Sequence, residues 1–167
     1  MSGFVATPPA PASPPASVVE VGGDFWPAID VNQTRAALRL GDGTVTHERL
    51  TTAIEGAVIA SLDQLTAWQA RQTAASLAEV DEITVSGEPI CTLLWQRAVR
   101  HFAAAEVVDA HAEITATNEG TQRAEDKRSA ADEHRRLAVE AIRRLLARGV
   151  QETDALSPSG GILVDLV

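Results

Sequence analysis

Residues 89–114 have the sequence PICTLLWQRAVRHFAAAEVVDAHAEI, and this stretch decides the fold. Its apolar residues recur every three to four positions, which is the period of an α-helix. Pro89 suits the first turn of such a helix, where its missing N–H does no harm. The main apolar face comprises Ile90, Leu94, Ala98, Phe102, Ala105 and Val108, and a second flank comprises Leu93, Val107 and Ile114. A helix with so wide an apolar surface is typical of the buried centre of a bundle.

Two further helices are expected before this central one. The segment from about residue 47 to 73 has Thr46 as its predicted N-cap. Its apolar positions, again at helical spacing, are Leu50, Ile54, Ala57, Val58, Ser61, Leu62, Leu65 and Trp68. A shorter helix is predicted at Val31–Leu40, with Asp30 as its N-cap and the glycines of segment 41–43 as its stop.

A fourth helix is expected from about residue 121 to 148. It follows a predicted turn at Asn118-Glu119-Gly120, and Gly149 is its expected C-cap. Its inward positions are Ala131, Ala138, Ile142, Leu145 and Leu146. Composition agrees with an all-α fold, because alanine is abundant, aromatic residues make up 4% of the chain and tyrosine is absent. We therefore predict an antiparallel bundle of about four helices over residues 25–149.

Charge is unevenly distributed in this chain, whose formal net charge is −9. The predicted fourth helix is net positive, while the loop at 74–88 contains Glu79, Asp81, Glu82 and Glu88 and no basic residue. Opposite charges of this kind suit contact between copies, with Arg135 and Arg136 facing Glu79, Asp81 and Glu82 of a neighbour. The alternative is a solvated helix face whose charges pair with one another at i,i+4 spacing.

Both ends of the chain have compositions unlike the centre. Residues 1–24 are rich in Pro, Ala, Ser and Gly, which predicts either a disordered tail or an arm that orders on a partner. The bulky pair Phe25 and Trp26 follows, in a chain with three Phe and three Trp, and these rings should be buried, with a partner as a candidate surface. Residues 1–24 are predicted to be a flexible arm.

Residues 150–167 are predicted to be an extended tail. A flexible Ser-Pro-Ser-Gly-Gly segment at 157–161 leads to an apolar, β-branched run. Exposed strand-forming segments tend to pair with something. The run therefore either folds back on its own domain or adds as a strand to a neighbouring subunit or partner. The partner-binding candidates in it are Ile162, Leu163, Val164, Leu166 and Val167.

The sequence shows no catalytic constellation, and we expect neither an enzyme nor a cofactor. The four histidines fall on three predicted helices without a metal-binding HExxH motif, and His101 is interpreted as a partly buried histidine. Cys91 is the single cysteine; a helix N-terminus could lower its pKa, but a buried structural role is commoner. No membrane span or secretory signal is apparent, so a soluble protein made in the cytoplasm is expected.

The order of these features resembles the head completion proteins of Peduovirus-type contractile-tailed phages. The resemblance covers residues from about 25 to 167, with Arg35 and Arg39 on the short helix. It rests on Phe25-Trp26-Pro27-Ala28-Ile29-Asp30, Glu48-Arg49-Leu50 through Leu65 and Trp68, Gly87 before Leu94-Trp95-Gln96-Arg97-Ala98-Val99, Ala116-Thr117-Asn118-Glu119-Gly120, Arg123-Ala124-Glu125 and the apolar tail. The proline-rich arm and the longer Ser/Gly stretch before the tail depart from the family pattern.

This resemblance implies a virion structural protein that acts as a head-to-tail connector. Copies would form a homo-oligomeric ring under the portal protein after genome packaging, twelvefold in related adaptors, with tail or neck proteins attaching below. Packaged DNA would pass through without sequence recognition, and the protein would sit at the head–tail junction of the virion. The alternative is a DNA-packaging or regulatory helical protein that contacts DNA through the basic helix at 121–148.

Overall fold

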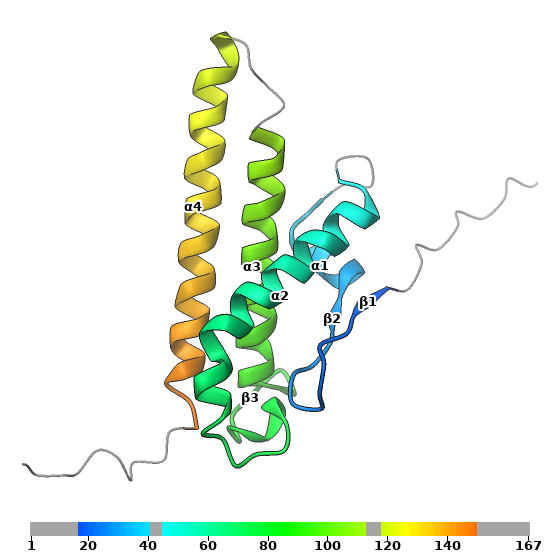
Figure 1. Ribbon diagram of the computed structural model, residues 1–167, viewed down its shortest axis with the longest axis vertical. Coiled ribbons are helices and arrows are strands. Elements are labelled where there is room, and N and C mark those ends of the chain that lie inside the picture. Colours follow the sequence, from blue (N-terminus) through cyan, green and yellow to red (C-terminus); the bar gives the residue numbers. More distant parts are fainter. Residues whose placement is uncertain (1–16, 41–44, 113–117, 150–167) are drawn as a thin grey trace, which may run out of the picture.

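The computed structural model describes residues 17–40, 45–112 and 118–149, and this part of the chain is mostly helical (Figure 1). Helices α3 and α4 lie side by side, and α2 crosses the pair. The elements in chain order are β1 (Val18–Val19), β2 (Ile29–Asp30), α1 (Val31–Ala37), α2 (His47–Gln69), the 3-10 helix η1 (Leu77–Glu79), β3 (Thr84–Val85), β4 (Glu88–Pro89), α3 (Ile90–Ala112) and α4 (Asn118–Leu146). The predicted four-helix fold is confirmed.

The described part of the domain begins at residue 17, before the predicted boundary at residue 25. Strand β1 pairs antiparallel with β2, so that Val19 lies opposite Ile29. Val19 and Val21 are buried in the core. The prediction that the arm extends to residue 24 is therefore corrected at its inner end, because Val19 and Val21 pack into the core of this same chain. Residues 1–16 of that arm lie outside the described residues.

Both predicted N-caps are confirmed. The Asp30 side chain accepts a hydrogen bond from the Gln33 N–H (2.8 Å), and the Thr46 side chain accepts one from the Arg49 N–H (3.3 Å). Each bond satisfies a backbone donor that the helix itself leaves unpaired.

The two helices that these caps begin end sooner than predicted. Helix α1 stops at Ala37 instead of Leu40, and Arg39 then adopts a left-handed φ of +54°, which a right-handed helix cannot continue through. Helix α2 stops at Gln69 instead of Thr73, where the Arg71 N–H bonds to the Trp68 carbonyl in a tighter turn.

The loop between α2 and α3 contains a small hairpin. Strand β3 pairs antiparallel with β4, so that Val85 lies opposite Glu88. Ser86 and Gly87 between the strands have φ of +54° and +84°, the pattern of a type I′ turn. The side chains of Ile83 and Val85 are about half exposed, at 51% and 50%.

Helix α3 begins at Ile90, directly after Pro89, as the sequence predicts. The predicted turn at Asn118-Glu119-Gly120 is wrong, because α4 begins at Asn118 and these residues are helical. Small side chains let helices approach closely, and both α3 and α4 bury alanines, namely Ala98, Ala103, Ala104, Ala105, Ala131, Ala138 and Ala141. Helix α4 ends at Leu146 instead of Arg148, so Gly149 lies three residues beyond the helix and is not its C-cap, although it has the left-handed φ of +64° that favours glycine.

Candidate interaction surfaces

Trp26 lies in the core, at the centre of a cluster of aromatic rings. It is 5% exposed, and its ring centroid lies 4.5 Å from that of Trp95 and 6.3 Å from that of Trp68. The Trp26 Nε1–H donates a hydrogen bond to Gln69 Oε1 over 3.0 Å. Phe25 packs edge-on against Trp26 and is partly buried. The expected burial of Trp26 is thus satisfied within the chain, and a partner contact through Phe25 stays a prediction.

The acidic loop and the end of α4 meet within one subunit. Asp81 accepts a hydrogen bond from the Ile83 N–H (2.9 Å) and forms an ion pair with Arg148 (2.8 Å). The Ile83 N–H, followed by Arg148, lowers the pKa of Asp81. Glu79 and Glu82 are exposed, and Glu79 accepts a bond from the Ala75 N–H. The charge complementarity predicted between copies is therefore partly used inside the chain.

Arg135 and Arg136 also have partners within the chain. Arg135 pairs with Asp132 on its own helix (2.9 Å) and with Asp109 on α3, while Arg136 pairs with Glu133 (2.6 Å). The hydrogen bonds between Arg136 and Glu133 lower the pKa of that carboxyl group and raise the pKa of the guanidinium. These pairs support the interpretation of α4 as a solvated, charge-paired face, and contact between copies through Arg135 and Arg136 stays a prediction.

Two histidines that the sequence does not connect meet between α3 and α4. His101 Nδ1 lies 3.1 Å from His134 Nδ1, so one ring donates a hydrogen bond and the other accepts it. Burial, followed by the nearby His134, lowers the pKa of His101. His101 is partly buried, as predicted. The signal that would find its partner is the antiparallel pairing of α3 with α4.

The single cysteine lies in the core. Cys91 is fully buried, and burial raises the pKa of its thiol to about 11, so the helix N-terminus does not activate it. Within the described ranges, no three His, Cys, Asp or Glu side chains gather to hold a metal ion. The described helices include none that is both long and apolar enough to cross a membrane.

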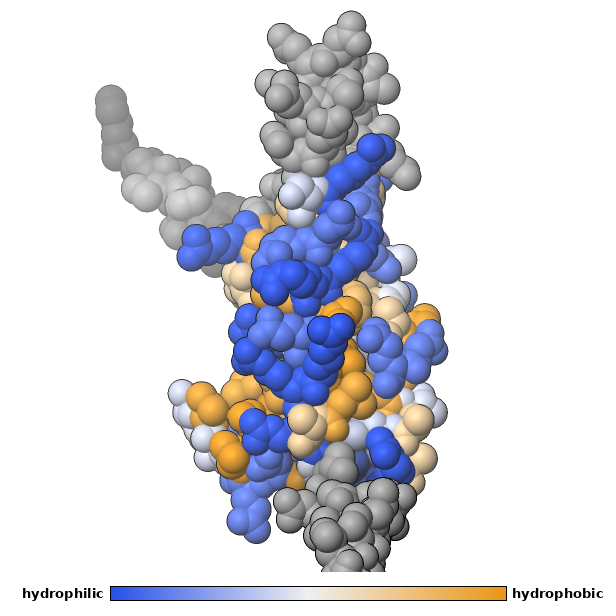
Figure 2. All heavy atoms as spheres, turned by 90° about the vertical axis from the view of Figure 1, so that its left-hand side faces the viewer, coloured by the Kyte–Doolittle hydropathy of each residue, from blue (hydrophilic) through white to orange (hydrophobic). Residues whose placement is uncertain are grey.

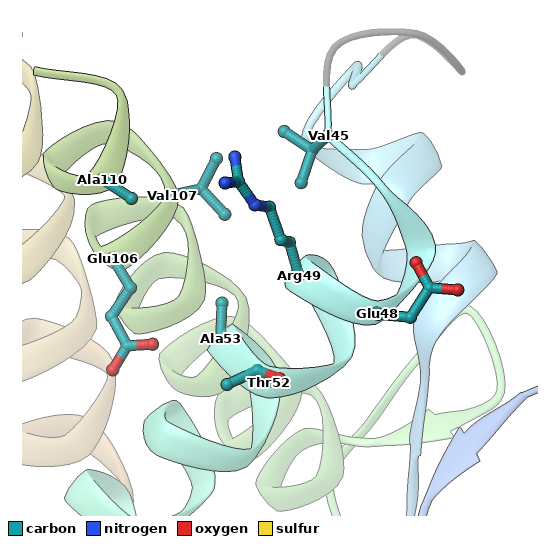
Figure 3. A pocket seen from close by; sticks show the side chains of 8 residues that line it. All are labelled: Val45, Glu48, Arg49, Thr52, Ala53, Glu106, Val107 and Ala110. Atoms are coloured by element: carbon teal, nitrogen blue, oxygen red, sulfur yellow. The ribbon is translucent and has the colours of Figure 1, made fainter. Parts of the chain in front are cut away.

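A groove lies between the first half of α2 and the second half of α3, where Figure 3 shows its lining side chains. Its volume is about 380 Å³, near the small end of ligand-binding pockets. Val45, Ala53 and Val107 are buried apolar residues of its lining. The Arg49 side chain points into the space between Val45 and Val107. The sequence analysis did not find this groove, because its two walls are more than fifty residues apart.

Apolar side chains are also exposed elsewhere on the surface. Seen from the α4 side, hydrophilic side chains cover the outer surface of this helix, and hydrophobic ones gather towards the end of the bundle where α4 finishes (Figure 2). The large apolar residues exposed in the described ranges are Val18, Ile59, Ile83 and Val85. The predicted partner-binding residues of the tail, Ile162, Leu163, Val164, Leu166 and Val167, lie outside the described residues.

Comparison with known proteins identifies this arrangement of helices at the level of a family. No curated protein and no solved structure matches the chain. Residues 21–154 match the family described as phage head completion protein (GPL), which covers all of the described fold from Val21 onward. This family is one of virion structural proteins with a role in head assembly. The chain therefore belongs to the phage head completion protein family.

Proposed function

We propose that this head completion protein binds the portal after genome packaging, stabilises the DNA-filled head and forms the platform for tail attachment at the head–tail junction. The observation that carries the proposal is the family match over residues 21–154. The character of the fold supports it, since the described surfaces offer grooves, exposed apolar side chains and charged faces suited to binding.

The proposal includes a homo-oligomeric ring of copies, twelvefold as in related adaptors, with a lumen through which DNA passes. The net charge of −9 supports this part of the proposal. Acidic side chains that line the lumen would repel the DNA phosphates and would not bind any particular base sequence. The tail or neck proteins then attach to the face of the ring that points away from the portal.

The tail is the part of the chain proposed to dock onto the portal or a neighbouring subunit. Deleting residues 158–167 is expected to abolish co-sedimentation with portals while leaving the helical circular dichroism spectrum intact. The matched control replaces Gly160 and Gly161 by Ser, which keeps the length and the apolar run and should keep binding. Portal binding that survives the deletion would sink the proposed role of the tail.

Charge pairing between copies is tested on α4. Reversing Arg135 and Arg136 together to Glu is expected to prevent ring formation on portals, as seen by negative-stain electron microscopy. Arg143→Glu with Arg144→Glu is the control, because it makes the same change in net charge on the same helix. Since Arg135 bridges to Asp109 on α3, circular dichroism must show that the fold persists. Intact rings in the first variant contradict this part of the proposal.

A further inference from the structure

We propose that the groove between α2 and α3 receives residues 162–167 of a neighbouring copy, an inference that rests on the proposed ring. The groove is lined by the apolar residues Val45, Ala53, Val107 and Ala110 together with the polar or charged residues Glu48, Arg49, Thr52 and Glu106, and Ala110 is exposed. The segment ILVDLV offers five aliphatic side chains around a single acid, Asp165. Burying such side chains against the lining provides the main favourable contribution to binding, because apolar surface is removed from water.

Arg49 supplies the polar complement to this segment. Its guanidinium forms no ion pair or hydrogen bond with another described residue, and it points into the groove (Figure 3). Asp165 is the one charged residue of the segment. A carboxylate that enters an apolar groove beside an arginine gains a charge-assisted hydrogen bond. The pair also fixes the position of the segment along the groove.

The two carboxylates of the groove do not occupy this position. Both Glu48 and Glu106 point away from the Arg49 guanidinium (Figure 3). Glu106 turns towards Gly56, where a Cβ atom would lie 3.0 Å from its carboxyl carbon. Burial, followed by the nearby Asp109, raises the pKa of Glu106. The groove thus presents one available cation over an apolar floor, which matches a mainly aliphatic segment with one acid.

The length of chain beyond the described fold allows the contact. The end of α4 and the end of α2 lie together, because the Trp68 Nε1–H donates to the Arg148 carbonyl (3.0 Å), whereas the groove lies at the start of α2. A helix of 23 residues, the length of α2, spans about 34 Å. The segment 150–161 can extend to roughly 40 Å, which is longer than α2, so its length permits residue 162 to lie far from the end of α4.

The separation of groove and tail also fits ring assembly. The receiving surface and the donated segment come from opposite ends of α2. Contacts between two different surfaces on identical chains are heterologous, and they close into a ring when the rotation between copies permits. Each copy would then give one tail and receive one.

A peptide experiment tests the occupant of the groove. A fluorescently labelled peptide of residues 158–167 is titrated into the chain that lacks these residues, and fluorescence anisotropy reports binding. We expect saturable binding that Ala110→Trp abolishes by filling the groove. Arg49→Glu should weaken binding about tenfold, and an Asp165→Arg peptide should restore it. Arg71→Glu, a charge reversal on an exposed arginine just beyond α2, should leave binding unchanged.

A crosslinking experiment tests which copy provides the tail. Thr52→Cys places a thiol on the exposed edge of the groove, and Val164→Cys places one in the segment. Oxidation of the full chain that contains both is expected to give disulfide-linked multimers. Buried Cys91, whose thiol pKa is raised to about 11, does not compete.

Four results would overturn the inference. They are an absence of peptide binding, binding that Ala110→Trp or Arg49→Glu leaves unchanged, a disulfide that forms only within one chain, and no disulfide at all. Co-sedimentation of the unmodified chain with portals is measured separately. A failed groove contact with intact portal binding leaves the proposed function standing, whereas lost portal binding by the unmodified chain contradicts that function itself.

Discussion

The indole of Trp26 contributes to the fold through two separable interactions, ring packing against Trp95 and a hydrogen bond to Gln69. Trp26→Phe keeps much of the packing and removes the bond, so we expect the free energy of unfolding to fall by about 1–2 kcal/mol. Urea denaturation followed by circular dichroism measures this loss. Combining the change with Gln69→Met should cost less than the sum of the two, and strict additivity would contradict the coupling.

The histidine pair makes stability depend on pH. Because burial and His134 lower the pKa of His101 in the folded state, the unfolded chain binds the proton more readily. This part of the stability is present above the unfolded pKa of about 6.5, and it is lost as the pH falls below that value through the folded pKa.

Thermal melts between pH 7.5 and pH 5 should therefore show a declining midpoint. The groups that face His101 are His134 and Glu133 on α4 and Arg97 and Arg100 on α3, and of these Glu133 alone favours the protonated form. His101→Gln should flatten the profile between pH 7.5 and pH 5. A profile as steep as that of the unmodified chain would assign the pH dependence to other groups.

Interactions between residues that are close together in the sequence could be predicted. Asp30 and Thr46 each bond to a backbone N–H three residues ahead, so local spacing reveals the cap. The partners of Trp26 and His101 lie 43 and 33 residues away. Periodicity shows that such residues face inward, but it does not show what they face.

Among the connections between elements, the end of α4 offers a sharp test. Gly149 has φ of +64°, and a Cβ atom there would lie 2.6 Å from Val80 Cγ1 and would also meet the Gln72 side chain. Gly149→Ala should lower the free energy of unfolding by at least about 1 kcal/mol, from the strained φ and the contact together. Gly22→Ala is the matched control, because no atom lies within 4 Å of that position and φ is not positive there. Equal effects of the two changes in urea denaturation would show that the close packing at Gly149 is unimportant.

Two isoleucines in α2 allow the contribution of a buried side chain to be compared with that of an exposed one. Ile54 is fully buried and Ile59 is 61% exposed. Ile54→Ala should cost about 2–5 kcal/mol through lost burial and a cavity, whereas Ile59→Gln should change the free energy of unfolding by less than about 0.5 kcal/mol. Guanidinium denaturation measures both. A large effect of Ile59→Gln on the isolated chain would mean that Ile59 contacts a part of the chain outside the described residues.

Helix identities could be predicted because apolar spacing persists over many turns, while helix ends could not be placed as well. The segment Asn118-Glu119-Gly120 looks like a turn, since Asn and Gly are both poor helix formers. In a helix of 29 residues, the cost of one glycine is about 1 kcal/mol, which the rest of the helix offsets. The early ends of α1 and α2 depend on single backbone conformations such as that of Arg39.

Over the whole molecule, charge argues against the alternative function of DNA binding through α4. Three basic residues of its described half pair with carboxylates, namely Arg135 with Asp132 and Asp109, Arg136 with Glu133, and Arg144 with Glu140. We predict weak filter binding to duplex DNA at low salt and none at moderate salt. Arg135→Glu with Arg136→Glu should not alter that result. Tight binding with a steep salt dependence would instead favour the DNA-contacting alternative.

The sequence predicted the class of fold and the family, yet not the candidate groove. A groove depends on small residues such as Ala53 and Ala110 meeting across two helices, and spacing along one helix does not record that meeting. The tail residues could be proposed from the sequence because an apolar run after a Ser/Gly segment stands out locally. A candidate donor segment can thus be proposed from the sequence, whereas a candidate receiving surface requires the fold.

The junction at the end of α4 has a mechanical consequence. The Arg148 carbonyl accepts a hydrogen bond from Trp68, its guanidinium holds Asp81, and Gly149 packs against the Gln72–Val80 segment. A pulling force applied through residue 150 would therefore be shared among α4, the end of α2 and the acidic loop, and the last turn of α4 would not carry it alone. If the tail docks in a DNA-filled particle as proposed, this junction would let it bear tension without unravelling α4.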